Sequence, residues 1–214
     1  MWEHISNLHL SVKVIVIVLL SAVPLSLYAD DRPLTNDILY CFSLQKKLHP
    51  HFSTAVYSEF TVNSGPLSIG YNYSCLSVSY MPKPWLSFSV AGGYTGEGQS
   101  SKWHHKFQSI QKFSFGNFSL AFRESVTHTR DIRSGDNGGV LRCRVNLSYN
   151  IAGSRMSPLF NVETYLWDKW RRTSIYVGTR IAVSECLGVN FYYMRSEMPA
   201  RQMNHLVIAM SFSI

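Results

Sequence analysis

The chain has 214 residues and a formal net charge of +7. Charged residues make up 15% of it, against roughly 25% in typical soluble domains, and aromatic residues reach 14%. This composition excludes a disordered tail, which would have few aromatic residues and many charges. It also does not suit a coiled coil, whose surface would be rich in Glu and Lys. The positive charge alone does not distinguish between nucleic acid, anionic lipid and no specific partner.

The N-terminal segment, residues 1–29, is predicted to be a secretory signal peptide. Residues 14–28 are uncharged, follow Lys13 and end just before Asp30. This apolar stretch of about 15 residues is shorter than the ~18 to 20 residues of a membrane-spanning helix. An uncleaved anchor helix is the alternative interpretation. Cleavage would leave residues 30–214 as a single domain.

The rest of the sequence repeats one pattern. Runs of roughly ten residues carry apolar or aromatic side chains at every second position, and breaks rich in Gly, Pro, Asn or Ser separate them. The pattern predicts β-strands, and its length matches the ~9 to 11 residues with which a tilted strand crosses a membrane. The runs lie at residues 37–46, 52–63, 67–81, 85–95, 103–115, 118–130, 139–150, 158–167, 171–183, 187–196 and 204–214.

The connections between the runs alternate in length. Those after the odd-numbered runs are mostly tight, and longer polar ones follow the fourth, sixth and tenth runs, at 96–102, 131–138 and 197–203. Short turns at one end and long loops at the other are typical of outer-membrane barrels, which usually have an even number of strands. We therefore expect ten to twelve strands, either with 37–46 outside the barrel wall or with one strand missed. The predicted fold is all-β, an antiparallel up-and-down transmembrane β-barrel.

The last run has the features of a C-terminal assembly strand. Every second residue is large and apolar, and small residues such as Ala209 and Ser211 stand between them. We expect this strand to engage the outer-membrane barrel assembly machinery and to face outer-membrane lipid. A buried edge strand of a soluble barrel is the alternative. The large residues are Leu206, Ile208, Met210, Phe212 and Ile214.

Strand alternation separates an apolar face from a polar one. The polar face carries charges of both signs near the middle of the strands, and we expect them to form a paired network inside the lumen, because an uncompensated buried charge costs several kcal/mol. A solvent-exposed face is the alternative. Glu124 falls on the apolar face, so a β-bulge near Arg123 and Glu124 is predicted. The expected network is Glu59, Arg123, Arg142, Arg144, Glu163 and Arg180.

Aromatic residues gather near the ends of the runs, as expected of the girdles at the two surfaces of a bilayer. Aromatic residues in the core or at the edge of a soluble sandwich are the alternative. The predicted girdle residues are Trp85, Trp103, Trp167, Trp170, Tyr57, Tyr80, Tyr94, Tyr149 and Tyr165.

Four cysteines remain after the signal peptide: Cys41, Cys75, Cys143 and Cys186. In an oxidising compartment they could pair in three ways, which the sequence does not distinguish. They contain no CxxC pair and have no His at metal-ligand spacing, so we expect no metal site. Small buried apolar side chains or one disulfide are the simplest interpretation.

The search for catalytic residues yields one alternative. His104, His105 and His128 could combine with Ser109 or Ser125 as in outer-membrane lipid hydrolases. The sequence contains no nucleophile elbow, Walker loop or paired-carboxylate spacing. We therefore expect no catalytic residue and no cofactor. Nucleic-acid binding is not expected either, because the basic pairs at 46–47 and 171–172 are isolated.

The residues at 120–125 (LAFRES), 141–149 (LRCRVNLSY) and 161–163 (NVE), followed by Arg180 and the closing strand, resemble an uncharacterised family of secreted β-barrel proteins from Gram-negative bacteria. This family has a domain of unknown function and is thought to form outer-membrane barrels. The resemblance implies the barrel and its membrane, and it implies no reaction.

The sequence thus predicts a small barrel in the outer membrane of a Gram-negative bacterium, with a polar lumen and either a structural or interaction role or a narrow channel. Its oligomeric state is left open. One alternative is a soluble periplasmic barrel that binds an apolar ligand, with large apolar side chains inside and polar ones outside. The second alternative is the outer-membrane lipid hydrolase.

Overall fold

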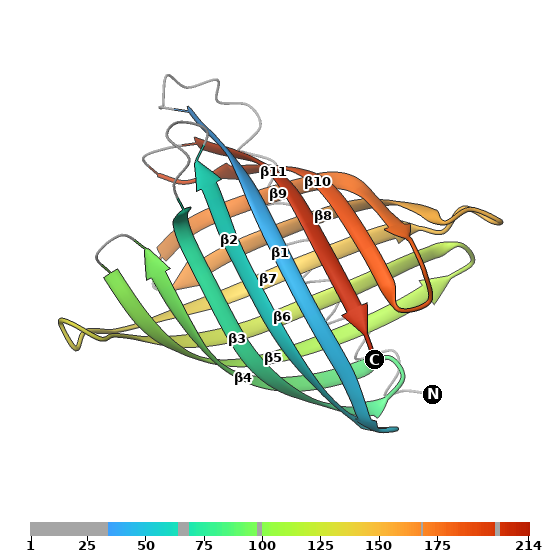
Figure 1. Cartoon of the computed structure of the whole chain (residues 1–214), viewed down its shortest axis with the longest axis horizontal. Helices are drawn as coiled ribbons and strands as arrows, with labels where there is room; N and C mark the ends of the chain where they lie inside the picture. The colour runs from blue at the N-terminus through green and yellow to red at the C-terminus, as the bar shows by residue number, and fades with distance from the viewer. Residues whose placement is uncertain (1–33, 64–68, 98–99, 168, 200–201) are drawn as a thin grey trace.

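All eleven predicted runs form strands of one sheet that closes into a barrel (Figure 1). The computed structural model describes residues 34–63, 69–97, 100–167, 169–199 and 202–214, so the predicted signal peptide at 1–29 lies outside the described residues. Consecutive strands pair antiparallel. The strands are β1 (Leu34–His49), β2 (Phe52–Asn63), β3 (Ile69–Lys83), β4 (Leu86–Glu97), β5 (Ser100–Phe115), β6 (Phe118–Asp131), β7 (Asn137–Tyr149), β8 (Met156–Trp167), β9 (Lys169–Ala182), β10 (Leu187–Glu197) and β11 (Gln202–Ser213).

The first and last strands close the barrel as a parallel pair. β1 lies between β2 and β11, and its register with β11 runs from Leu34 opposite Gln202 to Gln45 opposite Ser213. At the end of the pair, the amide of Ile214 donates to the carbonyl of Gln45 across 2.9 Å. The expected range of ten to twelve strands is confirmed, because the described residues form eleven. The two explanations offered for an even number are wrong: the run at 37–46 belongs to the wall, and a parallel pair lets the eleven described strands close the sheet.

The predicted difference between short and long connections is weaker than expected. Only residues 98–99 separate β4 from β5, whereas residues 150–155 separate β7 from β8. Polar residues at the predicted loop 96–102 continue the strand ladder, with Gly96 opposite Ser101 and Glu97 opposite Ser100. Polar side chains do not prevent strand pairing, because the backbone N–H and C=O groups of polar residues need hydrogen-bond partners as much as those of apolar residues.

The two faces of the sheet have opposite chemistry. Large apolar side chains cover the outer face, with Leu76, Phe107 and Val177 each more than half exposed. The inner face holds Glu163 and Ser174, which have no exposed surface at all. This distribution is the reverse of what the soluble barrel with an apolar ligand requires. One part of the inner face is apolar, where Cys41, Tyr176, Met194 and Val207 pack together.

Glu124 stays on the outer face. The predicted bulge is wrong, because β6 keeps a continuous register with both neighbours, and Glu124 lies opposite Ser109 on β5 and Cys143 on β7. The Ser109 hydroxyl donates to the Glu124 carboxylate across 3.5 Å. Changing the face of one residue would displace every side chain that follows it. The unbroken ladder of β6 therefore keeps the Glu124 carboxylate on the outer face, near the middle of the strand.

The outward aromatic residues lie near both ends of the strands. Tyr94 packs edge-on against Trp103 at one end, and at the other end Tyr80 packs against Phe52. Tyr149 packs against Phe118 at that same end. Trp85 lies in the β3–β4 turn under the Lys83 ammonium. The predictions for the Trp167 and Trp170 side chains fall outside the described part of the chain.

The girdle prediction is wrong for Tyr57 and Tyr165, which point into the lumen. They occupy the same alternating positions as Glu59 and Glu163, and their hydroxyls donate to those carboxylates. A tyrosine suits this face because its ring fills space while its hydroxyl finds an acceptor.

The structure places the four cysteines apart, and all are free thiols. Cys41 on β1 and Cys75 on β3 are buried, whereas Cys186 is exposed in the β9–β10 turn. On the last strand, Leu206, Phe212 and Ile214 are exposed and Val207 is buried, whereas Ile208 and Met210 are half-buried. The assembly role of this strand stays a prediction.

The parallel closure is testable through a native thiol. Cys41 lies directly opposite Ala209 in the β1–β11 register. In the folded Ala209→Cys variant, a short reagent that joins two thiols is expected to link residues 41 and 209, which mass spectrometry of the digested protein detects. The same variant with Cys41→Ser is the control and should give no such peptide. Reaction of Cys41 without linkage to residue 209 would contradict the parallel pair.

Candidate functional site

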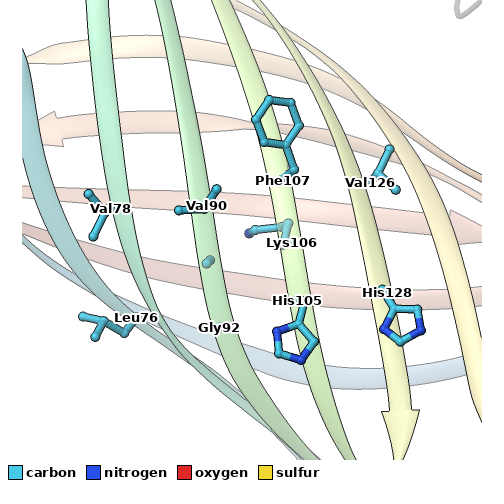
Figure 2. A pocket seen from close by; sticks show the side chains of 10 residues that line it. Leu76, Val78, Val90, Gly92, His105, Lys106, Phe107, Val126 and His128 are labelled. Carbon is cyan, nitrogen blue, oxygen red and sulfur yellow. The ribbon is translucent and has the colours of Figure 1, made fainter.

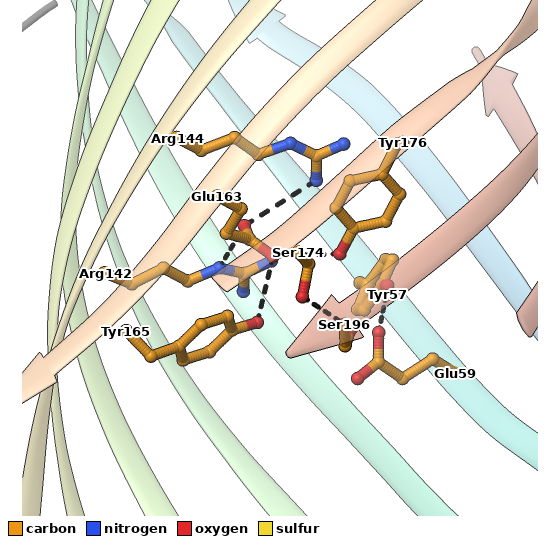
Figure 3. Close-up of polar contacts among 9 residues, drawn as sticks. All are labelled: Tyr57, Glu59, Arg142, Arg144, Glu163, Tyr165, Ser174, Tyr176 and Ser196. Atoms are coloured by element: carbon orange, nitrogen blue, oxygen red, sulfur yellow. Dashed lines mark hydrogen bonds and ion pairs between the residues drawn. The ribbon is translucent and has the colours of Figure 1, made fainter. Parts of the chain in front are cut away.

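A buried carboxylate lies at the centre of the polar lumen. Glu163 on β8 has a fully buried side chain and accepts a hydrogen bond of 2.5 Å from the Arg142 Nε atom. The Arg144 guanidinium lies 3.9 Å from the same oxygen. The hydroxyls of Tyr165 and Tyr176 donate to the other oxygen across 3.0 and 2.9 Å (Figure 3). Two cations and two hydroxyls thus replace the water that burial removes from this carboxylate.

Strand register brings these groups together. Arg142 and Arg144 are two residues apart on β7, so both side chains point to the same face. Glu163 lies directly opposite Arg144 in the β7–β8 pair, and Ser174 on β9 lies opposite Glu163. The Ser174 hydroxyl is 2.7 Å from that of Ser196 on β10, which extends the polar contacts to a fourth strand.

Tyrosine rings hold the arginines in place. The Arg172 guanidinium lies 3.9 Å from the centre of the Tyr165 ring, and the Arg142 guanidinium lies 5.1 Å from that same ring. Arg144 lies 4.7 Å from the Tyr176 ring. Guanidinium groups over aromatic faces at such distances gain electrostatic attraction as well as packing. Stacking therefore stabilises these neighbouring positive charges, for which Glu163 is the one carboxylate in ion-pair contact within the described part of the chain.

Glu59 forms a second, separate centre. Its carboxylate accepts hydrogen bonds from the Tyr57 hydroxyl and, across 3.0 Å, from the Tyr71 hydroxyl. These partners are neutral, so Glu59 differs from Glu163, which has cationic partners. Both carboxylates project into the same lumen from different strands, β2 and β8 (Figure 3).

The structure brings together some of the expected network and not all of it. Arg142, Arg144 and Glu163 are in direct contact, and Arg123 lies opposite Arg144 in the β6–β7 register. Arg180 is exposed and lies beside Gly188, where an added Cβ would be 3.5 Å from its Nε atom. Arg180 therefore does not take part in the contacts around Glu163.

Sequence reasoning missed several lumen residues. Arg172 and Tyr176 lie on β9 at the alternating positions of Arg180, and Tyr71 lies opposite Thr61 on the lumen face of β2. Lys106 on β5 alternates with the outward Phe107. The same period of two that identified Arg142 could have found each of them.

Positive charge exceeds negative charge in this part of the lumen. Among the described residues, the Nε atoms of Arg123, Arg144 and Arg172 are buried and make no hydrogen bond. Five basic side chains there face two carboxylates: Lys106, Arg123, Arg142, Arg144 and Arg172 against Glu59 and Glu163. This group of seven is called the lumen charge network below.

The residues proposed for a lipid hydrolase are not brought together. His104 points inward, where its Nε2 atom lies 2.5 Å from the Thr95 hydroxyl. His105 and His128 lie opposite each other on the outer face, whereas Ser125 is buried on the inner face. Ser109 is outward but four residues from His105 along β5, which is about 13 Å in a strand. These positions do not form a nucleophile and base pair.

No group of three or more metal-ligating side chains occurs within the described ranges. In that same part of the chain, no helix is long and apolar enough to cross a membrane.

The sheet is closed and mostly antiparallel, with charged groups inside and apolar groups outside, and this arrangement defines the class of closed β-barrels with a polar lumen. One solved structure, described as a "KdgM porin", is similar to the chain with a TM-score of 0.53 and 11% identical residues, and the match covers 83% of this chain and 98% of that chain. Such a low identity shows a shared fold. No family model and no curated protein matches the sequence.

The buried carboxylate makes a prediction about stability. Glu163→Leu is expected to lower the free energy of unfolding by about 3–5 kcal/mol, because Arg142 and Arg144 would remain buried without their counter-charge. Urea titration of the folded barrel, followed by tryptophan fluorescence, measures the change.

The control is the double variant with Glu163→Leu and Arg142→Leu. Removing both partners should recover part of the lost stability, because a buried pair replaced by apolar residues of similar size is often neutral. A loss that is equal in the single and double variants would show that the charges are not coupled.

Proposed function

We propose that the chain is an outer-membrane β-barrel of a Gram-negative bacterium whose lumen is a narrow channel with a preference for anions. The proposal rests on the lumen charge network, in which five basic side chains face two carboxylates. Rings of Arg and Lys side chains are the means by which pores select anions. Membership of the uncharacterised family of secreted barrels that the sequence resembles is part of the same proposal.

The outer face supports a place in the membrane. Large apolar side chains are exposed on it, and aromatic residues such as Tyr94, Trp103 and Tyr149 are exposed near the strand ends. Only a closed sheet satisfies its backbone hydrogen bonds in lipid, and the β1–β11 pair closes this one. Water would leave so much apolar surface unfavourably exposed.

The strand number supports a narrow passage. Barrels of about eight strands are filled by side chains, and those of 16 to 18 strands leave a wide aqueous channel. Eleven strands fall between these sizes. The Glu163 cluster and the apolar cluster around Tyr176 project into this space and narrow it. We therefore expect the lumen to conduct only small hydrated ions, with a preference for anions.

Membrane residence is tested by fractionation. The protein expressed in a Gram-negative host is expected in the outer-membrane fraction, with faster migration in unheated than in heated denaturing gels, because a closed barrel resists detergent until heated. Recovery in the soluble periplasm with no change on heating would contradict the membrane proposal.

The charge preference is tested by reversal potentials of the purified barrel in a planar bilayer under a salt gradient. Lys106→Gln and Arg123→Gln each remove one lumen charge, and each is expected to lower the anion-to-cation permeability ratio by roughly fivefold, since a unit charge near the ion path contributes about 1 kcal/mol. Low ionic strength keeps the effect unscreened.

The matched control is Arg130→Gln, which removes the same charge from the outer face of β6, opposite Trp103. It should leave the reversal potential unchanged. Equal shifts in all three variants, or a wild-type barrel that conducts no ions, would contradict an anion-preferring lumen.

A further inference from the structure

A shallow, open groove crosses the outer face of four neighbouring strands. It has a volume of about 610 Å³ and lies over β3, β4, β5 and β6 (Figure 2). Its walls are exposed apolar side chains that belong to the outer belt of the barrel, including Leu76 at 58% and Val90 at 57%. Phe107 and Val126 complete the apolar wall. The groove is therefore a hollow in the surface that the proposed function places against lipid.

A glycine makes the hollow. Gly92 on β4 lies between Leu76 on β3 and His105 on β5. A Cβ atom added at Gly92 would meet nothing within 4 Å, and its backbone has no left-handed strain. The outward positions beside it on β3, β5 and β6 carry the side chains of Leu76, His105 and His128. The missing side chain at 92 therefore leaves room for a chain from outside the protein.

The strand registers arrange the groove in two rows, and a third row lies just beyond its lining. The deepest row is entirely apolar, the middle row adds the two histidines, and the outermost row has interfacial side chains and a cation. Alternate residues put successive rows about 6.8 Å apart along a strand. From the centre outward, the rows are Val78, Val90, Phe107 and Val126, then Leu76, Gly92, His105 and His128, then Ser74, Tyr94, Trp103 and Arg130.

The polar end of the groove is a cluster of donors. His105 and His128 lie side by side, with their ring centres 6.4 Å apart and nearly parallel. Each imidazole presents an N–H group. One row further out, Arg130 lies opposite Trp103, which packs edge-on against Tyr94 at 5.7 Å. Trp and Tyr at this level mark the depth of lipid headgroups, where phosphate oxygens would meet these donors.

We infer that this groove binds one anionic phospholipid, with an acyl chain over Gly92 and the phosphate at His105, His128 and Arg130. The inference rests on the proposed function, because only a barrel in a bilayer presents this face to lipid. The order of the rows matches the order of groups along a phospholipid: the apolar row would contact the acyl chain, and the rows with histidine and arginine would contact the phosphate, nearest to water. Arg130 favours a headgroup with net negative charge over a zwitterionic one.

A free phosphate ion would accept hydrogen bonds from the histidines and Arg130, but it would leave the apolar wall of the groove exposed. Two histidines alone are also too few for the closed ligand sets of structural metal sites. The groove and the donors together therefore favour a ligand with a chain and a phosphate.

Native mass spectrometry of the purified barrel, released from detergent micelles, tests the inference. The probes are dioleoylphosphatidylglycerol, which is anionic, dioleoylphosphatidylcholine, which is zwitterionic, and glycerophosphate, which has no chains. The wild-type barrel is expected to retain one phosphatidylglycerol molecule in preference to phosphatidylcholine. Excess glycerophosphate should not displace the bound lipid. If the site recognised free phosphate alone, glycerophosphate would displace the lipid.

Two variants separate the parts of the site. Gly92→Phe fills the hollow and is expected to abolish retention of the lipid. The double variant His105→Ala, His128→Ala is expected to lower retention of phosphatidylglycerol by roughly tenfold, the loss typical of hydrogen bonds to a charged group. The matched control is Val177→Phe, which adds the same ring at an outward position of β9 that is 55% exposed, and it should retain lipid like the wild type.

The heat-dependent gel shift is measured for every variant, so that a folding defect is recognised. Equal retention by folded wild type and folded Gly92→Phe would overturn the lipid site and leave the membrane proposal intact. Failure of the wild-type barrel to enter vesicles of the same lipids would overturn both. Equal retention of the two lipids by the wild type would overturn recognition of the anionic headgroup.

Discussion

Closure of the sheet is the constraint on which the rest of the structure depends. An open sheet has two edges of unpaired N–H and C=O groups, and these invite aggregation in water and are not tolerated in lipid. Here the parallel pairing of β1 with β11 removes both edges. Parallel pairs are slightly less stable per residue than antiparallel ones, and this pair offsets that weakness with a register that continues to Ile214.

Closure also explains why the lumen can hold so much charge. With inside and outside fixed for every strand, alternate residues of β7 and β8 meet in a space that lipid cannot enter. Burying Glu163 costs several kcal/mol unless its partners compensate for the lost water. Arg142 and Tyr176 supply that compensation. The cluster therefore fixes the arrangement of side chains in the lumen. Within the described residues, Arg123 and Lys106 make no direct ion pair with a carboxylate.

The sequence predicts the strands and their faces well, because a period of two is a local property. All eleven runs became strands, and Arg142 and Glu163 point inward as their alternation indicates. The predicted closed barrel is confirmed, but its closure through a parallel pair was not predictable, since the periodicity of β1 is the same whether its neighbour is parallel or antiparallel. Tyr57 and Tyr165 were misassigned because closeness to a strand end was given more weight than alternation. The bulge predicted near Glu124 was wrong because it was based on the cost of a charge on the apolar face, whereas the continuous register of β6 decides the position of this residue.

The lumen and the groove on the outer face are linked through the strands that they share. On β5, Lys106 points to the lumen between His105 and Phe107, which line the groove outside. A shift of one residue in the register of β5 would bring the ammonium to the outer face and the phenyl ring to the lumen. The proposed channel and the proposed lipid site would then be lost together, although no contact joins them. Selection on either face therefore acts on the same register, and the β4–β5 ladder, which runs unbroken from Leu86 to Glu97, is what holds that register.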